Sequence, residues 1–271
     1  EVEVLEYLSR DPKTRAVVAY LESIDRGREF LEVARGMRGR KPLVVLKGGR
    51  HEEAARAALS HTASMAGSDE VVDGALRQAG VIRVEDFHDL MNLGKAFSLR
   101  PEPCRLTSRR GDGVALVTVT GGGGVVSTDL LRSSGLSIAS LHKNTLEELS
   151  RLFPPWMPPS NPVDIWPTIE QRGLGAFSEV LRVVLADDAV DGVILLPFAS
   201  RQLEHFPFED IGALARESGK AVVSWVFGDL RFFLAYEERL REHGIPVFID
   251  LRSCVLALKA FLTYARHATM A

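Results

Sequence analysis

The sequence predicts an α/β protein of two lobes, each with a parallel sheet flanked by helices. First, the chain has 271 residues, which is more than one typical domain needs and enough to bury two cores. Second, short β-branched runs alternate with longer amphipathic segments. Third, segments of the first half recur in the second. Strand and helix alternating in this way are typical of parallel sheets with helices on both faces.

The expected strands are continuous apolar runs, as found in strands that are covered on both faces. They are residues 15–22, 42–47, 114–120, 192–198 and 221–226. The expected helices have apolar residues at helical spacing and charged outer faces. They are residues 28–38, 70–78, 86–97, 128–134 and 229–242.

Three segments recur in the same order, which predicts a duplicated domain. Residues 15–22, 41–45 and 79–84 resemble residues 191–198, 220–224 and 243–248, at offsets of roughly 165–180 residues. We therefore expect lobes at 1–98 and 113–271, joined by a linker at 99–112 that is polar and contains Pro and Arg. In the second copy a strand, a glycine-rich turn and a helix precede the repeat. The first copy begins with only the end of such a unit, so we expect a fragment whose first lobe lacks its first strand and turn.

Composition and charge narrow the classes of partner. A net charge of −3 and a charged fraction of 25% offer no polybasic surface, so neither nucleic acid nor a membrane is expected as a partner. No apolar run reaches the ~18 residues that would span a bilayer. Cys104 and Cys254 are far apart and have no paired spacing, which fits a reducing cytoplasm and predicts neither a disulfide framework nor a metal site.

Four glycines, Gly121–Gly124, follow the strand expected at 114–120 and precede a helix expected to open at about Val125. Glycines allow close approach of a ligand, and the free N–H groups at a helix start favour an anion. Gly121, Gly122, Gly123, Gly124 and Val125 are therefore candidate phosphate ligands. A tight strand-to-helix turn that binds nothing is the structural alternative.

A histidine lies in a small, polar segment after the strand expected at 42–47. Ser60-His61-Thr62 follows the carboxyl end of that strand, the edge at which open parallel sheets bind ligands. A neutral imidazole can accept a phosphoryl group as a covalent intermediate. His61 is thus the candidate nucleophile, with Ser60 and Thr62 in support, and a surface or capping histidine is the alternative.

Three further polar residues are candidates for the same chemistry. Glu22 ends the first expected strand, where its carboxylate could fix the tautomer of an imidazole or simply begin a helix. Asn161 and Asp164 lie in an expected turn after a proline-rich stretch and could serve a ligand or cap the next segment.

The ordered set of motifs resembles the NDP-forming acyl-CoA synthetases, namely the ADP-forming acetyl-CoA synthetases and succinyl-CoA synthetase. It consists of Leu21-Glu22, Lys47-x-Gly49-Arg50, Ser60-His61-Thr62, residues 79–83, Gly121–Gly124 and residues 160–164. The resemblance implies two flavodoxin-like lobes, a phosphorylated His61 and an orienting Glu22. It also implies that the Gly121–Gly124 helix start is one of two that cradle the phosphohistidine. The chain departs from the family pattern at Ala63, and its glycine turn lacks the family's Asn and Pro.

The resemblance also implies a reaction: acid, CoA and ATP give acyl-CoA, ADP and phosphate, reversibly, through the phosphohistidine. CoA, phosphate and ATP or ADP with Mg²⁺ are the implied ligands. The family's CoA-binding Rossmann domain and ATP-grasp domain are the implied partners, in an oligomer, and without them the chain is expected to be an inactive part of an acid–thiol ligase. The acyl group is left open. The alternative is a non-catalytic regulatory module of an acetyltransferase-fused relative, although such a module has no need of the His61–Glu22 pair.

Overall fold

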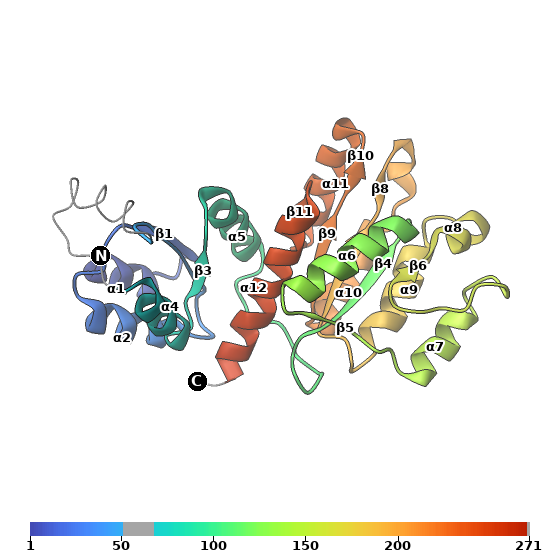
Figure 1. Ribbon diagram of the computed structural model, residues 1–271. Coiled ribbons are helices and arrows are strands. Elements are labelled where there is room, and N and C mark those ends of the chain that lie inside the picture. The colour runs from blue at the N-terminus through green and yellow to red at the C-terminus, as the bar shows by residue number, and fades with distance from the viewer. Residues whose placement is uncertain (51–67, 270–271) are drawn as a thin grey trace. The chain divides into compact units, whose positions relative to one another are not determined.

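The computed structural model describes residues 1–50 and 68–269, and these form two compact units (Figure 1). The first unit comprises Glu1–Pro103 with Thr263–Ala271, and the second comprises Cys104–Leu262. The chain stretch expected as a linker, residues 99–112, is thus divided between the units at Pro103 and Cys104. His61, Ser60 and Thr62 lie outside the described residues.

The first unit alternates helices and parallel strands. Its elements are α1 (Val2–Arg10), β1 (Val17–Leu21), α2 (Gly27–Met37), β2 (Leu43–Lys47), α4 (Asp69–Gln78), β3 (Ile82–Val84), α5 (Phe87–Leu99) and the last turns of α12 (Leu251–Thr269). The strands form a parallel sheet in the order β1-β2-β3. Among the described residues, β1 has no strand partner on its other side.

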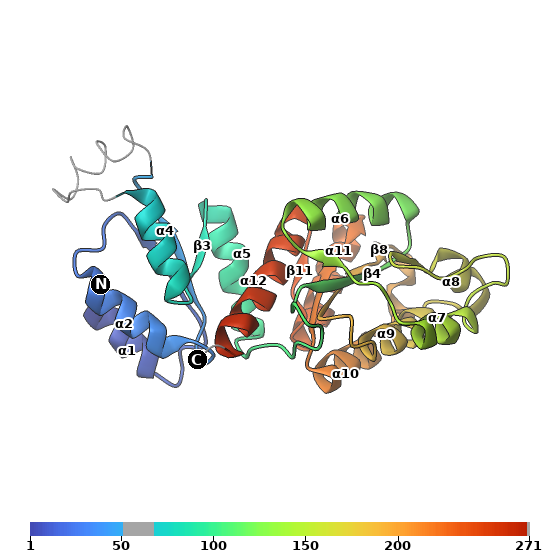
Figure 2. The ribbon, with the colours of Figure 1, turned by 60° about the horizontal axis from the view of Figure 1, so that its bottom comes forward.

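Both faces of this sheet are covered. Val17, Leu43 and Val45 pack with the buried residues of α1, α2 and α4 in one core. The other face meets α5, which contacts β1 and β2. Figure 2 shows α1, α2 and α4 on one side of the strands and α5 on the other. This arrangement explains why β2 is buried at every position and reads as a continuous apolar run.

The second unit contains the larger sheet. Its elements are β4 (Gly113–Thr118), α6 (Gly121–Ser133), β5 (Ser137–Ile138), α7 (Lys143–Ser150), β6 (Val163–Asp164), α8 (Trp166–Arg172), α9 (Ala176–Leu185), β7 (Gly192–Leu196), β8 (Phe198–Ala199), η1 (Arg201–His205), α10 (Phe208–Ser218), β9 (Ala221–Trp225), β10 (Phe227–Gly228), α11 (Leu230–Glu242), β11 (Val247–Phe248) and most of α12.

Six strands of this unit form a parallel sheet in the order β11-β9-β7-β4-β5, with β6 also pairing with β4, while β8 and β10 form a separate pair. Residues of α9, α10 and α11 share one core with alternate residues of β4 and β7. Figure 2 shows α6 on the opposite side of the sheet from α9 and α10. The predicted α/β class with parallel sheets flanked by helices is therefore confirmed in both units.

The predicted internal repeat is visible in the topology. The repeated segments form β1, β2 and β3 in the first unit and β7, β9 and β11 in the second, and each set lies in the same spatial order. A buried lysine precedes the middle strand of each set. Lys41 Nζ donates to the carbonyl groups of Leu8 (2.5 Å) and Asp11 (2.8 Å), and Lys220 Nζ donates to Asp187 O (2.8 Å). Both lysines thus donate to main-chain carbonyls at or just after the end of a helix, α1 for Lys41 and α9 for Lys220.

The helix after the glycine turn begins earlier than the sequence suggests. We expected it to open at about Val125, but α6 begins at Gly121 and Thr120 is its N-cap residue. Glycine disfavours helix interiors by about 1 kcal/mol relative to Ala, which explains the late prediction. The first turn forms nonetheless because its glycines pack closely: a Cβ on Gly124 would lie 3.0 Å from Pro162 Cβ. The four glycines are therefore the first turn of a helix and not a loop before it.

Candidate functional site

Glu22 follows β1 at the carboxyl edge of the first unit's sheet. Its backbone leaves the strand in a bend, and its side chain is partly buried. The hydroxyl of Tyr20, two residues earlier on the same face of β1, donates to Glu22 Oε1 at 3.1 Å. Burial and this hydrogen bond raise the pKa of Tyr20. Tyr20 therefore remains protonated near neutral pH and holds one oxygen of Glu22, while no hydrogen bond to the other is recorded among the described residues.

Lys47 fixes the backbone on which Glu22 sits. It is the last residue of β2, and its Nζ donates to Glu22 O (2.7 Å) and to Gly48 O (2.5 Å). The Gly48 N–H in turn donates to Leu21 O at 2.9 Å. Burial, followed by the charge of Arg83, lowers the pKa of Lys47. The ends of β1 and β2 are thus tied together at the position where Glu22 leaves the sheet.

The two ends of the segment that carries His61 meet at the same edge of this sheet. Arg50, before the segment, lies 3.4 Å from Asp69, the first residue of α4 after it. Arg83 of β3 also pairs with Asp69 and, at 3.4 Å, with Asp73. Burial raises the pKa of the Asp69 carboxyl, but the Arg83 hydrogen bond and the charges of Arg83 and Arg50 outweigh it, so the net shift is downward.

The α6 N-terminus forms the second candidate site, in the other unit. Thr120 Oγ1 accepts from Gly123 N at 3.5 Å, and the N–H of Thr120 donates to Thr118 Oγ1 at 3.0 Å. Within the described part of the chain, the N–H groups of Gly121 and Gly122 have no acceptor. Both residues are exposed, so their N–H groups are open to an anion. Val125 lies one turn further, where helical geometry directs its N–H to a carbonyl of the first turn. The open N–H groups of this helix start are therefore those of Gly121 and Gly122, whereas the N–H of Val125 is directed into the helix.

Asp164 lies beside this helix start. Its Oδ1 accepts from Trp166 N at 3.1 Å, and its Oδ2 would lie 3.4 Å from a Cβ placed on Gly121. A carboxylate at a helix N-terminus interacts favourably with the helix dipole. The same charge opposes an incoming phosphate. The sequence left two roles open for Asp164, and its position is compatible with both. One carboxylate oxygen caps the following segment, and the other faces the candidate anion site.

Asn161 has a structural role. Its Oδ1 accepts from Leu116 N at 3.0 Å, and its Nδ2 donates to Val114 O and Ala139 O, both at 2.9 Å. Along this edge β4 pairs with β5 at its start and with β6 at its end. The Asn161 side chain fills the intervening gap by bonding to the β4 backbone. All three of its hydrogen bonds are made to main chain, so Asn161 holds the sheet together.

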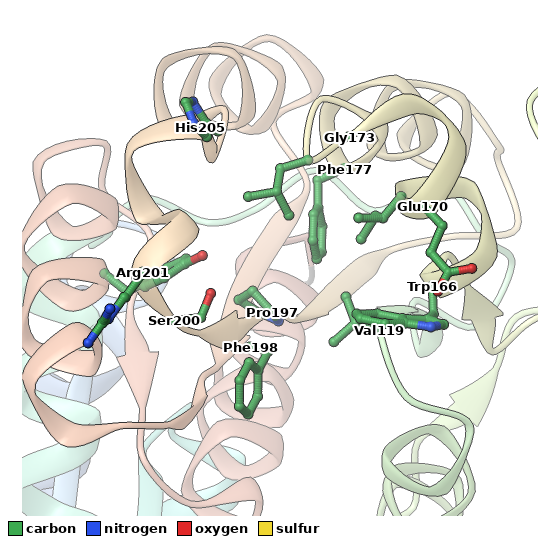
Figure 3. A pocket seen from close by; sticks show the side chains of 13 residues that line it. Val119, Trp166, Glu170, Gly173, Phe177, Pro197, Phe198, Ser200, Arg201 and His205 are labelled. Carbon is green, nitrogen blue, oxygen red and sulfur yellow. The ribbon is translucent and has the colours of Figure 1, made fainter.

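A cleft of about 860 Å³ opens at the carboxyl edge of the second unit's sheet (Figure 3). It is lined by Val119, Trp166, Ile169, Glu170, Gly173, Leu174, Phe177, Pro197, Phe198, Ser200, Arg201, His205 and Tyr236. In Figure 3, Arg201 and His205 lie on one side of this space, and Trp166 and Glu170 lie on the other. Val119 connects the cleft to the α6 start because it immediately precedes the cap residue Thr120.

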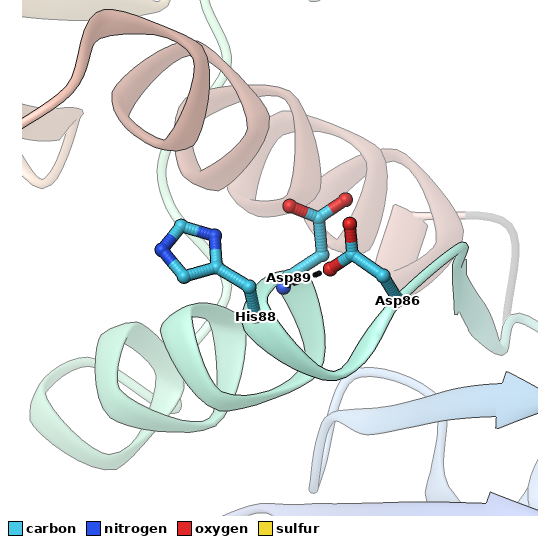
Figure 4. A group of neighbouring side chains, drawn as sticks. All are labelled: Asp86, His88 and Asp89. Atoms are coloured by element: carbon cyan, nitrogen blue, oxygen red, sulfur yellow. Dashed lines mark hydrogen bonds between the residues drawn. The ribbon is translucent and has the colours of Figure 1, made fainter.

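Asp86, His88 and Asp89 form a further cluster, at the start of α5 (Figure 4). Asp86 Oδ1 accepts from Asp89 N at 2.7 Å, which makes Asp86 the N-cap of the helix. The His88 ring lies 3.3 Å from Asn92 Nδ2, one turn along. Helix capping therefore accounts for the position of the Asp86 carboxylate.

The roles of some residues of these sites were missed from the sequence, although Lys47 itself belongs to the Lys47-x-Gly49-Arg50 motif. Tyr20 and Lys47 position Glu22, and Trp166 and Phe198 line the cleft. Lys47 carries a signal that could have revealed it, namely a charged residue at the end of an otherwise apolar strand. The other three carry no local signal, because aromatic residues in an α/β protein are more often part of the core. In the described part of the chain, no helix combines the length and apolar character required to cross a membrane.

Comparisons with known proteins show which domain and which enzymes the chain resembles. Residues 1–97 match the succinyl-CoA ligase like flavodoxin domain. The chain is 36% identical over 268 residues to ADP-forming acetate–CoA ligase II of Archaeoglobus fulgidus, covering 98% of the chain and 38% of the relative. It is 32% identical over 273 residues to the alpha subunit of ADP-forming acetate–CoA ligase I of Pyrococcus furiosus, covering 98% of the chain and 56% of the relative.

A solved structure shares the fold. It is the dinucleotide forming acetyl-coenzyme A synthetase 1 of Ca. Korarchaeum cryptofilum in complex with phosphate and ADP. Its TM-score is 0.81 at 28% identity, over 99% of this chain and 57% of that chain. The chain therefore spans between 38% and 57% of the length of these relatives. From the matched domain, the identity over nearly its whole length and the shared fold, the chain belongs to the NDP-forming acyl-CoA synthetase family, which is succinyl-CoA synthetase-like.

Proposed function

We propose that the protein containing this chain is an NDP-forming acyl-CoA synthetase, an acid–thiol ligase, in which His61 carries the phosphoryl group. Its relatives are ADP-forming acetate–CoA ligases, and one related structure holds phosphate and ADP. The observation that carries the proposal is the position of Glu22. It is held by Tyr20 and Lys47 at the sheet edge where both ends of the His61 segment meet.

The proposed chemistry is one acyl transfer followed by two phosphoryl transfers. Phosphate attacks the thioester carbonyl carbon, the CoA thiolate leaves, and an acyl phosphate forms. A ring nitrogen of His61 then attacks phosphorus, and the carboxylate of the acid leaves. The phosphohistidine finally passes the phosphoryl group to ADP and returns to neutral imidazole. Each step reverses, so the net reaction interconverts acyl-CoA, ADP and phosphate with acid, CoA and ATP.

The residues of this chain have distinct proposed tasks. Glu22 accepts a hydrogen bond from one His61 nitrogen, which fixes the tautomer and leaves the other nitrogen free to attack. The exposed N–H groups of Gly121 and Gly122 receive the phosphate oxygens, with Ser60 and Thr62 in support. CoA, the nucleotide and Mg²⁺ are proposed to bind mainly to a CoA-binding domain and an ATP-grasp domain, which the longer relatives have room for.

The test is phosphorylation of the histidine in the full-length protein with its nucleotide-binding domain. After incubation with Mg²⁺ and γ-labelled ATP, we expect acid-labile, base-stable label on His61. His61→Ala should abolish the label and lower turnover by at least ~10³-fold, because a covalent carrier between distant sites has no substitute. His88→Ala is the matched control, since His88 is an exposed histidine on α5. More than a tenth of wild-type turnover in His61→Ala would exclude the carrier role.

A further inference from the structure

A polar cavity of about 380 Å³ lies at the amino edge of the first unit's sheet, and its volume is within the range of small-molecule sites. Arg15 lies just before β1 and Arg40 just before β2, so both line the cavity from the starts of these strands. Glu22 follows the other end of β1. A strand of five residues is roughly 17 Å long, so the cavity is well separated from the candidate phosphoryl-transfer residues.

Basic side chains outnumber acidic ones around this cavity. Four basic and two acidic residues line it, namely Arg10, Arg15, Arg40, Lys41, Asp11 and Glu102. The lining therefore carries two more positive than negative charges, although the whole chain has a net charge of −3. The Asp11 carboxylate is also engaged within its own turn, where it accepts from Lys13 N (3.1 Å) and Thr14 Oγ1 (2.6 Å). A concave surface with this excess of positive charge attracts anions.

Lys41 offsets a feature of the cavity that would otherwise repel an anion. The C-terminal end of α1 contributes to the lining, and helix C-termini carry partial negative charge. Lys41 Nζ donates to three main-chain carbonyls at this end, those of Leu8 (2.5 Å), Ser9 (3.2 Å) and Asp11 (2.8 Å). The lysine charge is thus placed against the helix end, and the arginine charges are left for a ligand.

The three arginines keep most of their donors available. In the described part of the chain, no hydrogen bond or ion pair is recorded for the guanidinium groups of Arg10 and Arg40, and both residues are exposed. Arg15 donates one N–H to Leu99 O at 3.3 Å. A guanidinium has five N–H donors and commonly binds the oxygens of a phosphate or carboxylate in pairs. Three such groups around one cavity therefore suit a ligand with several anionic oxygens.

The internal repeat shows that the two units differ in charge at this edge. The repeated segment that begins with Arg15 in the first unit begins with Asp191 in the second. The Asp191 carboxylate accepts from the N–H groups of Thr107 (2.8 Å) and Gly113 (2.9 Å). The second unit thus has an anionic group of its own at the start of β7, whereas the first unit has a cation at the corresponding position. This difference favours an external anion in the first unit.

We propose that this cavity binds a diphosphate group and that the bound anion stabilises this edge of the first unit. The phosphate oxygens pair with Arg10, Arg15 and Arg40, and the ligand thereby connects the end of α1 with the starts of β1 and β2. The site goes beyond the proposed phosphoryl transfer and does not depend on it, because it lies at the opposite edge of the sheet from Glu22. Free pyrophosphate and the diphosphate of a nucleotide offer the same chemistry, and the experiment separates them.

Hydrogen exchange read by mass spectrometry locates the anion in the full-length protein. Increasing pyrophosphate should slow exchange in residues 9–15 and 39–42, and the concentration that gives half of the effect measures the local affinity. Arg10→Gln and Arg40→Gln should each raise that concentration by ~10-fold or more, because each removes a charge-assisted contact. Arg35→Gln is the matched control, since Arg35 is an exposed arginine of α2 outside the cavity, and it should leave the concentration unchanged.

A parallel titration with ADP identifies the source of the diphosphate. Slower exchange of the same residues with both pyrophosphate and ADP would identify the diphosphate group as the ligand, and slower exchange with pyrophosphate alone would identify the free anion. Both results support the proposal. No slowing by pyrophosphate, or an equal loss of affinity in Arg35→Gln, would overturn it. An effect that disappears in Gly122→Asp would also overturn it, because the slower exchange would then originate at the α6 start.

Discussion

At the scale of single residues, position within a turn decides what each glycine and carboxylate can do. A Cβ placed on Gly122 would have no neighbour closer than Thr120 Oγ1, at 3.9 Å. A Cβ placed on Gly123 would instead lie 2.6 Å from Thr120 Cγ2. A side chain at Gly123 therefore disturbs the cap itself. Gly122 is the position at which charge can be added without a clash.

Two substitutions should change anion affinity at the α6 start in opposite directions. Gly122→Asp adds a negative charge beside the open N–H groups and should weaken phosphate binding by about tenfold or more. Asp164→Asn removes the carboxylate that faces Gly121 and should strengthen it. Phosphate titration followed by NMR of the backbone amides at positions 121 and 122 measures both effects. If the chemical shift of neither amide changes with phosphate in the wild-type protein, the hypothesis that this helix start binds an anion is wrong.

The Glu22 carboxylate should matter for chemistry more than for folding. Glu22→Gln keeps the shape and the hydrogen bond from Tyr20, but it cannot stabilise an imidazolium-like charge. The rate of His61 phosphorylation should therefore fall by at least ~10²-fold with the melting temperature nearly unchanged. Tyr20→Phe removes one hydrogen bond to Glu22 and should cost less, about 10-fold. Rapid-quench phosphorylation assays give the rates, and an unchanged rate in Glu22→Gln would reduce Glu22 to a capping residue.

At the scale of elements, two polar side chains form hydrogen bonds with main-chain groups that the strands and helices leave unpaired. Asn161 bridges the part of β4 that lies between its pairings with β5 and β6. Asp187 does the same for the start of α7: its carboxylate accepts from the N–H of His142 (2.7 Å) and of Ala189 (2.8 Å). Both side chains bind main-chain groups that the neighbouring strands and helices leave unpaired.

Asn161→Ala should destabilise the second unit. It leaves Leu116 N–H without an acceptor and removes one donor each from Val114 O and Ala139 O. Unpaired, partly buried main-chain groups cost about 1–3 kcal/mol each, so we expect a loss of roughly 2–4 kcal/mol in the free energy of unfolding. Urea denaturation measures it. Asn144→Ala, an exposed asparagine on α7, is the control, and equal effects of the two substitutions would contradict the bridging role.

Asp187 should make the second unit sensitive to acid. Burial raises its pKa, but hydrogen bonds from Thr145, His142 and Ala189 and the charge of His142 outweigh burial, so the pKa lies below its ordinary 3.8. A carboxyl whose pKa is lowered by folding stabilises the fold above the unfolded-state pKa. That stabilisation is lost as the pH falls through the folded-state pKa. Asp187→Asn should therefore lower stability at pH 7 and flatten its decline below about pH 4. Urea midpoints at several pH values test this, and parallel curves for the two proteins would refute it.

At the scale of the whole molecule, the units differ in how the chain builds them. The second is one continuous segment, Cys104–Leu262, whereas the first combines Glu1–Pro103 with the end of the chain. Within the first unit, Tyr264 meets Phe97 edge-on at 5.6 Å between ring centroids. Ala268 likewise packs against Gly39, since a Cβ placed on Gly39 would lie only 2.9 Å from the Ala268 Cβ. The last turns of α12 therefore complete the core of the first unit.

Deleting residues 263–271 should destabilise the first unit and spare the second. Loss of the buried Tyr264 ring alone removes apolar contact worth about 3–5 kcal/mol. Hydrogen exchange read by mass spectrometry should show faster exchange in β2 and unchanged protection in β7. Residues 104–262 produced separately should fold cooperatively. Retained protection of β2 in the shortened chain would mean that the helix end is dispensable.

The sequence by itself determined the five longest strands, the repeat, the family and the place of Glu22 at a strand end, because apolar runs and strand termini are local signals. It did not predict the two-residue strands β5, β6, β8 and β10, which are too short to leave such a signal. The sequence placed the start of α6 a turn too late. The low helix propensity of glycine is visible locally, whereas the packing of Gly124 against Pro162, which overrides it, depends on a distant segment. Asn161 reaches groups 22 to 47 residues away in the chain. The cleft gathers Val119, Trp166, Phe177 and Phe198 from four separate elements or connections. Only the tertiary structure could decide these, because hydrogen bonds and cavities depend on which distant segments the fold brings together.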